Sequence, residues 1–282
     1  MAVRMTAMEA RRPDREPPED RWTPRPYPRA ELSRALLAGG VAGLEVTHPL
    51  DNVLWKIERL GAGDPNVQFG ISGLAGAFTS WEVLERVAEA SGFDPDPSAR
   101  WGPVAIDPDR VIDACEAAGD RLAVACQRGE RVLLATGHPT GLPLLYLEVG
   151  RQLAARGVEL VRPLEGEAWE GGRRRTRRQV RFIRGVAMLT MRGSVVHTHE
   201  AEPMERMLAS ADPLPDLVFA DHGFAGAAIE GGVETIGIAD VNDAALVVAR
   251  ALGRIEHVIV MDDNVDPDAY WPCFQAIAAR LP

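Results

Sequence analysis

The sequence is poor in cysteine and contains no long apolar run. Its three cysteines, Cys115, Cys126 and Cys273, have no paired spacing, which argues against a disulfide framework and against a zinc ribbon. No segment is long and apolar enough to cross a bilayer, and the N-terminal segment lacks the apolar core of a signal peptide. These absences predict a globular protein of the reducing cytoplasm.

Net positive charge is also absent. The formal net charge of -10 and the pI near 5.2 argue against nucleic acids and membranes as partners, because both would repel the chain at long range. Positive charge is concentrated only in the arginines of residues 173–178. A solvated surface loop explains this cluster. The alternative is a lid, or an arm of a neighbouring subunit in a homo-oligomer, whose guanidinium groups bind phosphate oxygens.

Several catalytic signatures are missing as well. The chain has no Gly-x-Gly-x-x-Gly dinucleotide motif, no Gly-x-Ser-x-Gly nucleophile elbow and no His-Glu-x-x-His zinc motif. Cys115 and Arg121 have the spacing found in thiol phosphatases, but Glu116 and Asp120 between them would repel a phosphate group. The common nucleophilic routes are therefore disfavoured.

The chain is long enough to bury a core, with 282 residues of which 46% are hydrophobic. Residues 1–29 combine prolines with alternating charges and predict a disordered or loosely packed arm. Residues 30–128 predict a mainly helical part that packs on the same domain, with a glycine-rich surface loop at 61–77. We expect helices in this part at residues 30–38, 53–60, 78–90 and 109–128, with Asp51 or Asn52 as a cap of the second helix.

Residues 129–282 alternate short apolar runs with helical periods and predict an α/β domain that carries the site. Such repeats favour a Rossmann-like fold, an open and mainly parallel sheet with helices on both faces. The expected strands are 132–135, 158–162, 180–183, 186–191, 194–198, 216–220, 235–239 and 257–261. The expected helices are 142–156, 203–208, 224–230, 243–252 and 267–280.

Polar side chains follow successive predicted strands of this domain. Because the carboxyl ends of parallel strands share one edge of an open sheet, these side chains should line a common crevice. Asp and Asn also cap the helices that follow strands, but so many polar strand ends favour a functional crevice. The side chains in question are His138, His197, His199, Asp221, His222, Asp240 and Asp262.

His197 and His199 are separated by one residue, so on a strand both imidazoles would lie on one face. Asp221, His222, Asp240 and Asp262 would complete a mixed nitrogen and oxygen shell suited to Mn²⁺, Zn²⁺ or iron, whereas an all-carboxylate subset would suit Mg²⁺. Alternatively, the two histidines contact a phosphate directly or satisfy each other's hydrogen bonds. A metal site and a phosphate site are therefore both open.

The turn at residues 136–141, Thr-Gly-His-Pro-Thr-Gly, connects a predicted strand to a predicted helix. Backbone N–H groups and the positive end of the helix suit an anion such as phosphate, although an ordinary βα turn remains the alternative. We expect His138 and His222 to be catalytic, one of them as the general acid. The expected phosphate-binding residues are Thr136, Gly137, Thr140, Gly141 and Gly223, of which Gly223 could instead serve close packing.

Four segments together resemble an actinobacterial family of phosphatases. They are Ala-Thr-Gly-His-Pro-Thr-Gly at 135–141, Val-His-Thr-His-Glu at 196–200, Ala-Asp-His-Gly-Phe-Ala-Gly-Ala at 220–227 and Ile-Ala-Asp-Val-Asn-Asp at 238–243. The resemblance covers about residue 30 to the C-terminus and implies hydrolysis of a phosphate ester. The leading hypothesis is a metal-assisted hydrolase acting on a small phosphate monoester.

Two other classes of protein stay open. One is a non-hydrolytic binding protein or sensor for a phosphorylated or nucleotide-like metabolite, which would need the anion-binding loops but no metal. The other is an isomerase or lyase that uses His138 and His222 as an acid/base pair.

Overall fold

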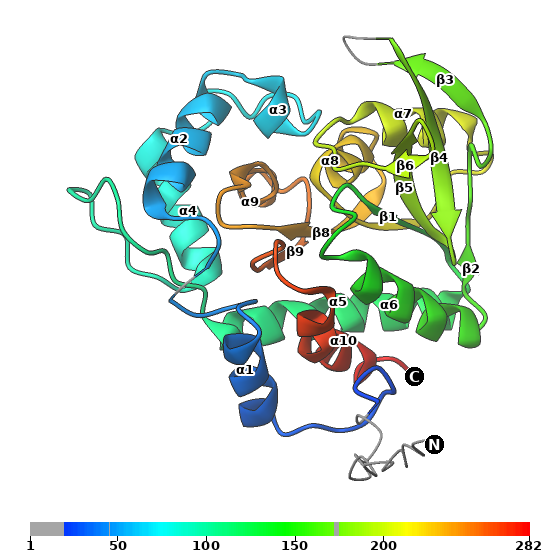
Figure 1. The fold of residues 1–282 in the computed structure, drawn as a ribbon, viewed down its shortest axis with the longest axis horizontal. Helices are drawn as coiled ribbons and strands as arrows, with labels where there is room; N and C mark the ends of the chain where they lie inside the picture. Colours follow the sequence, from blue (N-terminus) through cyan, green and yellow to red (C-terminus); the bar gives the residue numbers. More distant parts are fainter. Residues whose placement is uncertain (1–19, 45, 172–174) are drawn as a thin grey trace, which may run out of the picture.

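The computed structural model describes residues 20–44, 46–171 and 175–282 (Figure 1). Its centre is a mainly parallel sheet with the strand order β3-β4-β5-β1-β7-β8-β9 and helices on both faces, which confirms the predicted fold class. The strands are β1 (Arg131–Thr136), β3 (Ala168–Gly171), β4 (Thr176–Ile183), β5 (Val186–Met191), β7 (Leu217–Asp221), β8 (Glu234–Ala239) and β9 (His257–Val260). Two short strands, β2 (Glu159–Leu160) and β6 (Ser194–Val195), pair with β1 and β5.

The parallel part of the sheet sets the place of the site. β1, β5, β7, β8 and β9 run parallel and lie side by side in the order β5-β1-β7-β8-β9. In a doubly wound sheet of this order, the direction of winding reverses between the strands that come first and third in the chain, which here are β1 and β7. That position is the gap between the carboxyl ends of β1 and β7, where Thr136 and Asp221 lie.

Helices cover both faces of the sheet (Figure 1). On one face lie α5 (Pro108–Arg128), α6 (Pro143–Ala155) and α10 (Trp271–Ala278). On the other face, α8 (His222–Glu230) and α9 (Ala244–Ala251) contact the strands, and α7 (Glu202–Ser210) packs on α8. Outside α9 lie α2 (Leu50–Gly61) and α4 (Ser80–Ser91), which bring the N-terminal part of the chain close to the ends of β8 and β9.

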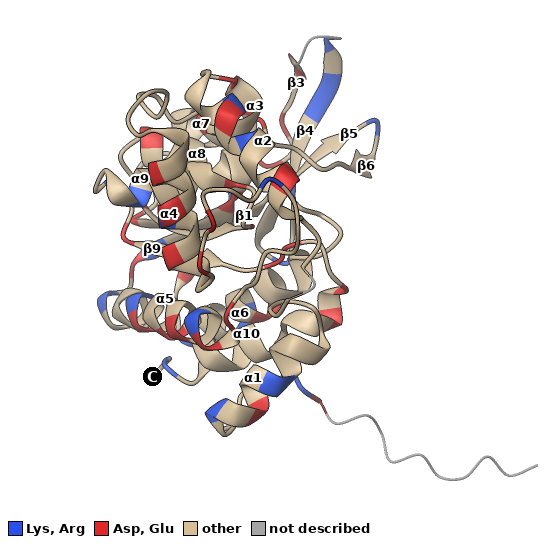
Figure 2. Ribbon diagram, turned by 90° about the vertical axis from the view of Figure 1, so that its left-hand side faces the viewer, with Lys and Arg blue, Asp and Glu red and all other residues tan. Residues whose placement is uncertain are grey.

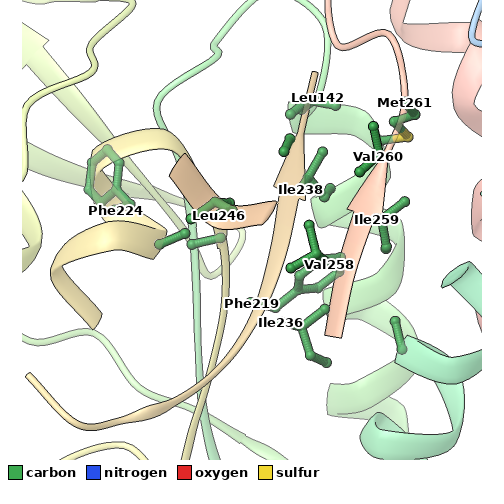
Figure 3. Packing of buried hydrophobic residues seen from close by; sticks show 14 of the residues in the cluster. Leu142, Phe219, Phe224, Ile236, Ile238, Leu246, Val258, Ile259, Val260 and Met261 are labelled. Atoms are coloured by element: carbon green, nitrogen blue, oxygen red, sulfur yellow. The ribbon is translucent and has the colours of Figure 1, made fainter. Parts of the chain in front are cut away.

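The parallel strands β1, β5, β7, β8 and β9 are buried on both faces, which explains their continuous apolar runs. Ile236 and Ile238 of β8 and Ile259 of β9 are fully buried. They pack in one cluster with Phe224 of α8 and Leu246 of α9 (Figure 3). This apolar layer holds the strand ends in place and leaves the polar residues that follow them at one edge.

Three differences from the expected boundaries bear on the site. α2 begins at Leu50 after Pro49, so Asp51 lies inside its first turn and the predicted cap at Asp51 or Asn52 is wrong. The glycine-rich residues 61–77 contain the short helix α3 (Pro65–Gln68), which the sequence did not predict. β6 ends at Val195, because the chain then leaves the sheet and Thr198 N donates to Gly137 O at 2.9 Å.

Residues 1–19 of the expected N-terminal arm lie outside the described residues. Residues 20–28 lie against α10, and they lead into α1 (Arg29–Ala38). Trp22 Nε1 donates to Asp268 at 2.9 Å, and Gln275 Nε2 donates to the carbonyl oxygens of Arg21 and Thr23. Among the described helices, none is long and apolar enough to cross a bilayer.

The arginine-rich region lies in a β-hairpin. β3 and β4 pair antiparallel and rise beyond the body of the molecule, with basic residues along β4 (Figure 2). Arg173 and Arg174 lie outside the described residues, and Arg177 is exposed. Arg178 is buried and forms ion pairs with Glu200 and Glu202. One arginine of the cluster is therefore a structural contact to the segment that carries His199.

Candidate active site

Four histidines converge at the carboxyl edge of the sheet. His138 follows β1, His197 and His199 follow β6, and His222 begins α8 directly after β7. The ring centroids of His138 and His197 are 4.8 Å apart, and those of His138 and His222 are 5.7 Å apart. His199 lies 5.0 Å from His197 and 4.6 Å from His222. The cluster therefore spans the gap between β1 and β7, where a doubly wound sheet binds its ligand.

Close backbone approach brings these histidines together. A Cβ on Gly137 would clash with the carbonyl oxygen of Thr198, and a Cβ on Gly223 would clash with the carbonyl oxygens of His199 and Glu200. Glycine at these two positions lets the segment of His197 and His199 lie against both loops. The alternative role of Gly223 in close packing is thus present in the structure.

Two backbone amides of the predicted phosphate loop already have protein partners. Gly137 N donates to Asp221 Oδ1 at 2.7 Å, and His138 N donates to Thr136 Oγ1 at 3.0 Å. Gly141 is buried, and a Cβ there would lie 2.5 Å from the carbonyl oxygen of Asp263. Thr140 is exposed at the rim. Phosphate binding by this loop remains a prediction, and its free donors would have to lie at the end near Thr140.

His222 lies between carboxylates on both sides of its ring. Its Nδ1 is 2.8 Å from Asp221 Oδ1, and its Nε2 is 3.2 Å from Asp243 Oδ2 and 3.5 Å from Asp263 Oδ2. Burial by itself would lower the pKa of His222, but the hydrogen bonds to Asp221 and Asp243 raise that pKa well above its usual value. Burial by itself would raise the pKa of Asp221, but the hydrogen bond from His222 lowers that pKa below its usual value. Without a bound cation, His222 is therefore positively charged at neutral pH.

The other three imidazoles are neutral at neutral pH. Burial lowers the pKa of His138 to about 4 and the pKa of His199 to about 4, and the charge of His222 adds to both effects. Burial also lowers the pKa of His197, which is the exposed member of the cluster. A neutral imidazole is the form that binds a metal or accepts a proton.

The glycine-rich segment 61–77 contributes to the site instead of forming a plain surface loop. Phe69 is buried, and its ring edge contacts the rings of His199 and His222 at centroid distances of 5.2 and 5.4 Å. Asn66 O lies 3.1 Å from His199 Nδ1. The expectation of a plain surface loop is corrected here, and Gly226 of α8 permits the close approach of Phe69 to that helix.

Four carboxylates on the loops after β8 and β9 are almost completely buried: Asp240, Asp243, Asp262 and Asp263. Burial and the charges of Asp243 and Asp221 raise the pKa of Asp263 to about 7. The charge of His222 acts in the opposite direction and is outweighed. Burial and the charge of Asp263 raise the pKa of Asp240 well above its usual value. Burial by itself would raise the pKa of Asp243, but the hydrogen bond with His222 and the charge of Lys56 lower it below its usual value.

Several buried atoms of the cluster that could bind a metal ion have no hydrogen-bond partner within the described part of the chain. Buried polar atoms of this kind are costly, and in native proteins they point to a ligand, a water or an ion. Imidazole nitrogen and carboxylate oxygen are the donors that Mn²⁺ and Zn²⁺ accept. The atoms are His138 Nδ1 and the Oδ2 atoms of Asp221, Asp240 and Asp263.

Asp262, a predicted metal ligand, has other partners. Its Oδ2 accepts from Thr47 N at 2.5 Å, and its Oδ1 accepts from Thr47 Oγ1 at 3.0 Å and from Asn264 N at 2.9 Å. The neighbouring Asp263, which the sequence analysis did not select, lies 3.7 Å from His138 Nε2. Successive residues of an extended chain point in opposite directions, so only one of the two carboxylates can face the histidines.

The segment from residue 48 to residue 56 forms a second wall of the site, which the sequence analysis missed. The residues of this segment that contact the loop after β8 recur at four-residue spacing. The only cue in the sequence was the set of polar residues His48, Asn52 and Lys56 at this spacing. The contacts are His48 Nε2 with Asp240 Oδ2 at 3.6 Å, Asn242 Nδ2 with Asn52 Oδ1 at 2.7 Å and Lys56 Nζ with Asp243 Oδ1 at 2.8 Å.

The chain is similar to known proteins over most of its length. The profile of a protein family described as Phosphatase matches residues 27–281. The chain belongs to the Phosphatase family. A curated relative, Phosphatase SCO2771 of Streptomyces coelicolor, is 37% identical over 247 residues, which are 86% of this chain and 92% of the relative. Family membership confirms the resemblance to actinobacterial phosphatases and supports hydrolysis of phosphate esters. No solved structure is significantly similar to this chain.

Two groups of side chains in this Phosphatase family member could hold a metal ion, because their ligand atoms lie within 4.8 Å of one another. The two groups are His197, His199 and His222, and His222, Asp243 and Asp263. Both groups share His222, so one ion could use donors from each. Asp221 contacts His222 from the other side of the ring, which is the position of a carboxylate that orients a metal-bound imidazole.

Proposed function

We propose that this member of the Phosphatase family hydrolyses a small phosphate monoester with the help of a divalent cation in the histidine and aspartate crevice. The observation that carries the proposal is the convergence of four histidines with buried carboxylates at the gap between β1 and β7. A purely structural role would not explain so many buried ligand atoms that, among the described residues, have no hydrogen-bond partner.

The ligands would come from both candidate groups. His197, His199 and His222 offer nitrogen, and Asp243 and Asp263 offer oxygen, a mixed donor set that suits Mn²⁺ or Zn²⁺ better than Mg²⁺. When bound, such a cation supplies Lewis acidity and lowers the pKa of a water ligand. Asp240 and Asp262 would lie behind this set, since Asp240 contacts His48 and Asp262 binds Thr47.

The protein's own groups position and move protons. Asp221 accepts a hydrogen bond from Nδ1–H of His222 and so directs Nε2 toward Asp243 and Asp263. His138 belongs to neither ligand group, is neutral at neutral pH and can accept a proton at Nε2, next to Asp263 Oδ1.

Without a cation, the same geometry offers a second route to the acid and base. The pKa values of the stacked pair His138 and His222 move in opposite directions, which assigns His222 as proton donor and His138 as proton acceptor. Metal removal distinguishes the two routes. In the first, activity disappears with the cation; in the second, activity remains.

The test uses full-length protein freed of metal by a chelator and then given Mn²⁺, Zn²⁺ or Mg²⁺. Hydrolysis of para-nitrophenyl phosphate is measured together with metal binding by calorimetry. We expect the wild type to bind one of these ions and to gain activity from it. The H197A/H199A double variant should lose both, and H257A should lose neither, because His257 begins β9 at the opposite edge.

Each other result overturns a defined part. If chelated protein binds none of the ions and still hydrolyses the ester, the metal site is refuted. If no phosphate monoester of a metabolite panel is hydrolysed with or without metal, the phosphatase function is refuted. Binding of such a metabolite without turnover, unchanged in the double variant, would identify a sensor.

A further inference from the structure

We propose that Lys56 of α2 binds the phosphoryl group of the substrate and so is a substrate-binding residue of this site. The inference rests on the proposed phosphatase function and adds a residue that faces the crevice from the helical side. Lys56 is the only lysine of the chain, whose other basic side chains, histidines aside, are arginines.

The position of Lys56 places its ammonium group next to the reacting region. Its Nζ lies 2.8 Å from Asp243 Oδ1, and the other oxygen of Asp243 lies 3.2 Å from His222 Nε2. The side chain of Lys56 is 13% exposed and that of Asp243 is 4% exposed. The ammonium group is therefore separated from the histidine cluster by one carboxylate and still reaches solvent.

The charge of the crevice favours a further cationic group beside His222 and the proposed cation. Five buried carboxylates lie at the end of β7 and in the loops after β8 and β9, and within the described ranges none of them is ion-paired with an arginine. A phosphate dianion would be repelled by them unless positive charge lay beside it. Arg178 of the hairpin cannot serve, because Glu200 and Glu202 already bind it. The five carboxylates are Asp221, Asp240, Asp243, Asp262 and Asp263.

The ammonium group of Lys56 also has N–H donors that Asp243 does not use. A lysine carries three N–H donors, and in the described part of the chain the one hydrogen bond of Lys56 goes to Asp243. Two N–H groups are thus available for phosphate oxygens, without loss of the contact to Asp243. A purely structural tie is the competing explanation, but α2 is already tied to the same loop by Asn52 and Asn242.

The single lysine allows a direct spectroscopic test. Full-length protein grown with lysine labelled with ¹³C at the ε carbon should show one lysine resonance, that of Lys56. Inorganic phosphate is titrated in at constant pH and ionic strength, with Mg²⁺ or Zn²⁺ present and absent. We expect the resonance to move in a saturable way with phosphate and to stay in place with chloride. Equal responses to both anions overturn the proposal.

Three variants give the kinetic counterpart. K56M should raise the phosphate concentration for half-inhibition at least about tenfold, the effect of losing one hydrogen bond to a charged group. K56R keeps the charge and should restore part of the affinity. R59M removes one positive charge from the same helix, where Arg59 is paired with Asp64, and should change inhibition by less than about twofold. If K56M does not fold, K56R and the labelled wild type still decide the question.

The outcomes separate this inference from the proposed function. An active enzyme whose inhibition by phosphate is the same in the wild type and in K56M keeps the phosphatase function and overturns the role of Lys56. A saturable phosphate response of the Lys56 resonance in a protein that hydrolyses no ester supports the anion site and refutes the phosphatase function.

Discussion

Nδ1 of His222 lies 2.8 Å from Oδ1 of Asp221, the residue that precedes it in the chain. The same oxygen accepts the backbone N–H of Gly137, so one carboxylate links the end of β7 to the loop after β1. His222 has a φ of 46°, a left-handed conformation that is unfavourable for a residue with a side chain. Strained residues of this kind are concentrated at functional sites. In this conformation Nε2 lies 3.2 Å from Asp243 Oδ2 and 3.5 Å from Asp263 Oδ2.

We expect D221N to keep its fold and to lose activity and metal affinity by about 10- to 100-fold, as is typical when the partner of a ligand histidine is changed. Asparagine retains an acceptor oxygen but not the negative charge that stabilises the protonated Nδ1. Activity, metal binding by calorimetry and circular dichroism measure the three properties. D120N is the control, since Asp120 forms an exposed pair with Arg280. Wild-type activity in D221N would contradict the orienting role.

Stability should depend on pH through Asp263. Burial, opposed by His222, raises the pKa of Asp263 from its ordinary value of 3.8 to about 7. Between these values the folded state holds a proton that the unfolded state has lost, so this carboxyl makes the free energy of unfolding fall as pH rises. D263N removes this effect. Its stability relative to wild type should rise by up to about 3 kcal/mol from about pH 5 to about pH 8.

Urea denaturation of wild type, D263N and the control D120N at both pH values measures this difference. The same gain from D263N at both pH values would show that Asp263 titrates normally in the folded protein.

Gly226 should not tolerate a side chain. A Cβ there would overlap the carbonyl oxygen of Phe69 and lie 2.8 Å from the Phe69 side chain. Because backbone atoms cannot move aside cheaply, we expect G226A to lower the free energy of unfolding by about 3 kcal/mol. G61A is the matched control, since no atom lies within 4 Å of a Cβ at Gly61. Chemical denaturation compares them, and equal stability of the two variants would refute the close approach of Phe69.

The basic hairpin should act through one buried arginine. Arg178 is 5% exposed and pairs with Glu200, which directly follows His199. R178M should lower the free energy of unfolding by about 2 kcal/mol, less than for a fully buried pair because Glu200 is half-exposed. It should also lower activity, because Glu200 then no longer holds His199.

R177M is the control for this prediction and a test of the lid hypothesis. Arg177 is exposed on the same strand, so its replacement should change stability by less than about 0.5 kcal/mol. A tenfold or greater loss of kcat/KM in R177M would instead indicate that exposed arginines of the hairpin contact the substrate.

Much of the architecture was predictable because it depends on local pattern. Continuous apolar runs marked β1, β7, β8 and β9, and the helical periods between them imposed crossover connections and a parallel sheet. The same logic placed His138, Asp221 and His222 at one edge, since carboxyl ends of parallel strands share it. The histidines at 197 and 199 were predicted to lie on a strand, and they lie beyond it, although their rings are still 5.0 Å apart.

The sequence by itself thus determined the fold class and the edge that carries the polar residues. Only the tertiary structure decided which side chains face one another. Asp263 faces the histidines because the backbone N–H of Asp262 donates to Val41 O and the carboxylate of Asp262 accepts from Thr47. Lys56 reaches Asp243 across 187 positions of the chain. The direction of a side chain at a strand end is set by the segments that pack against it, and those segments are distant in sequence.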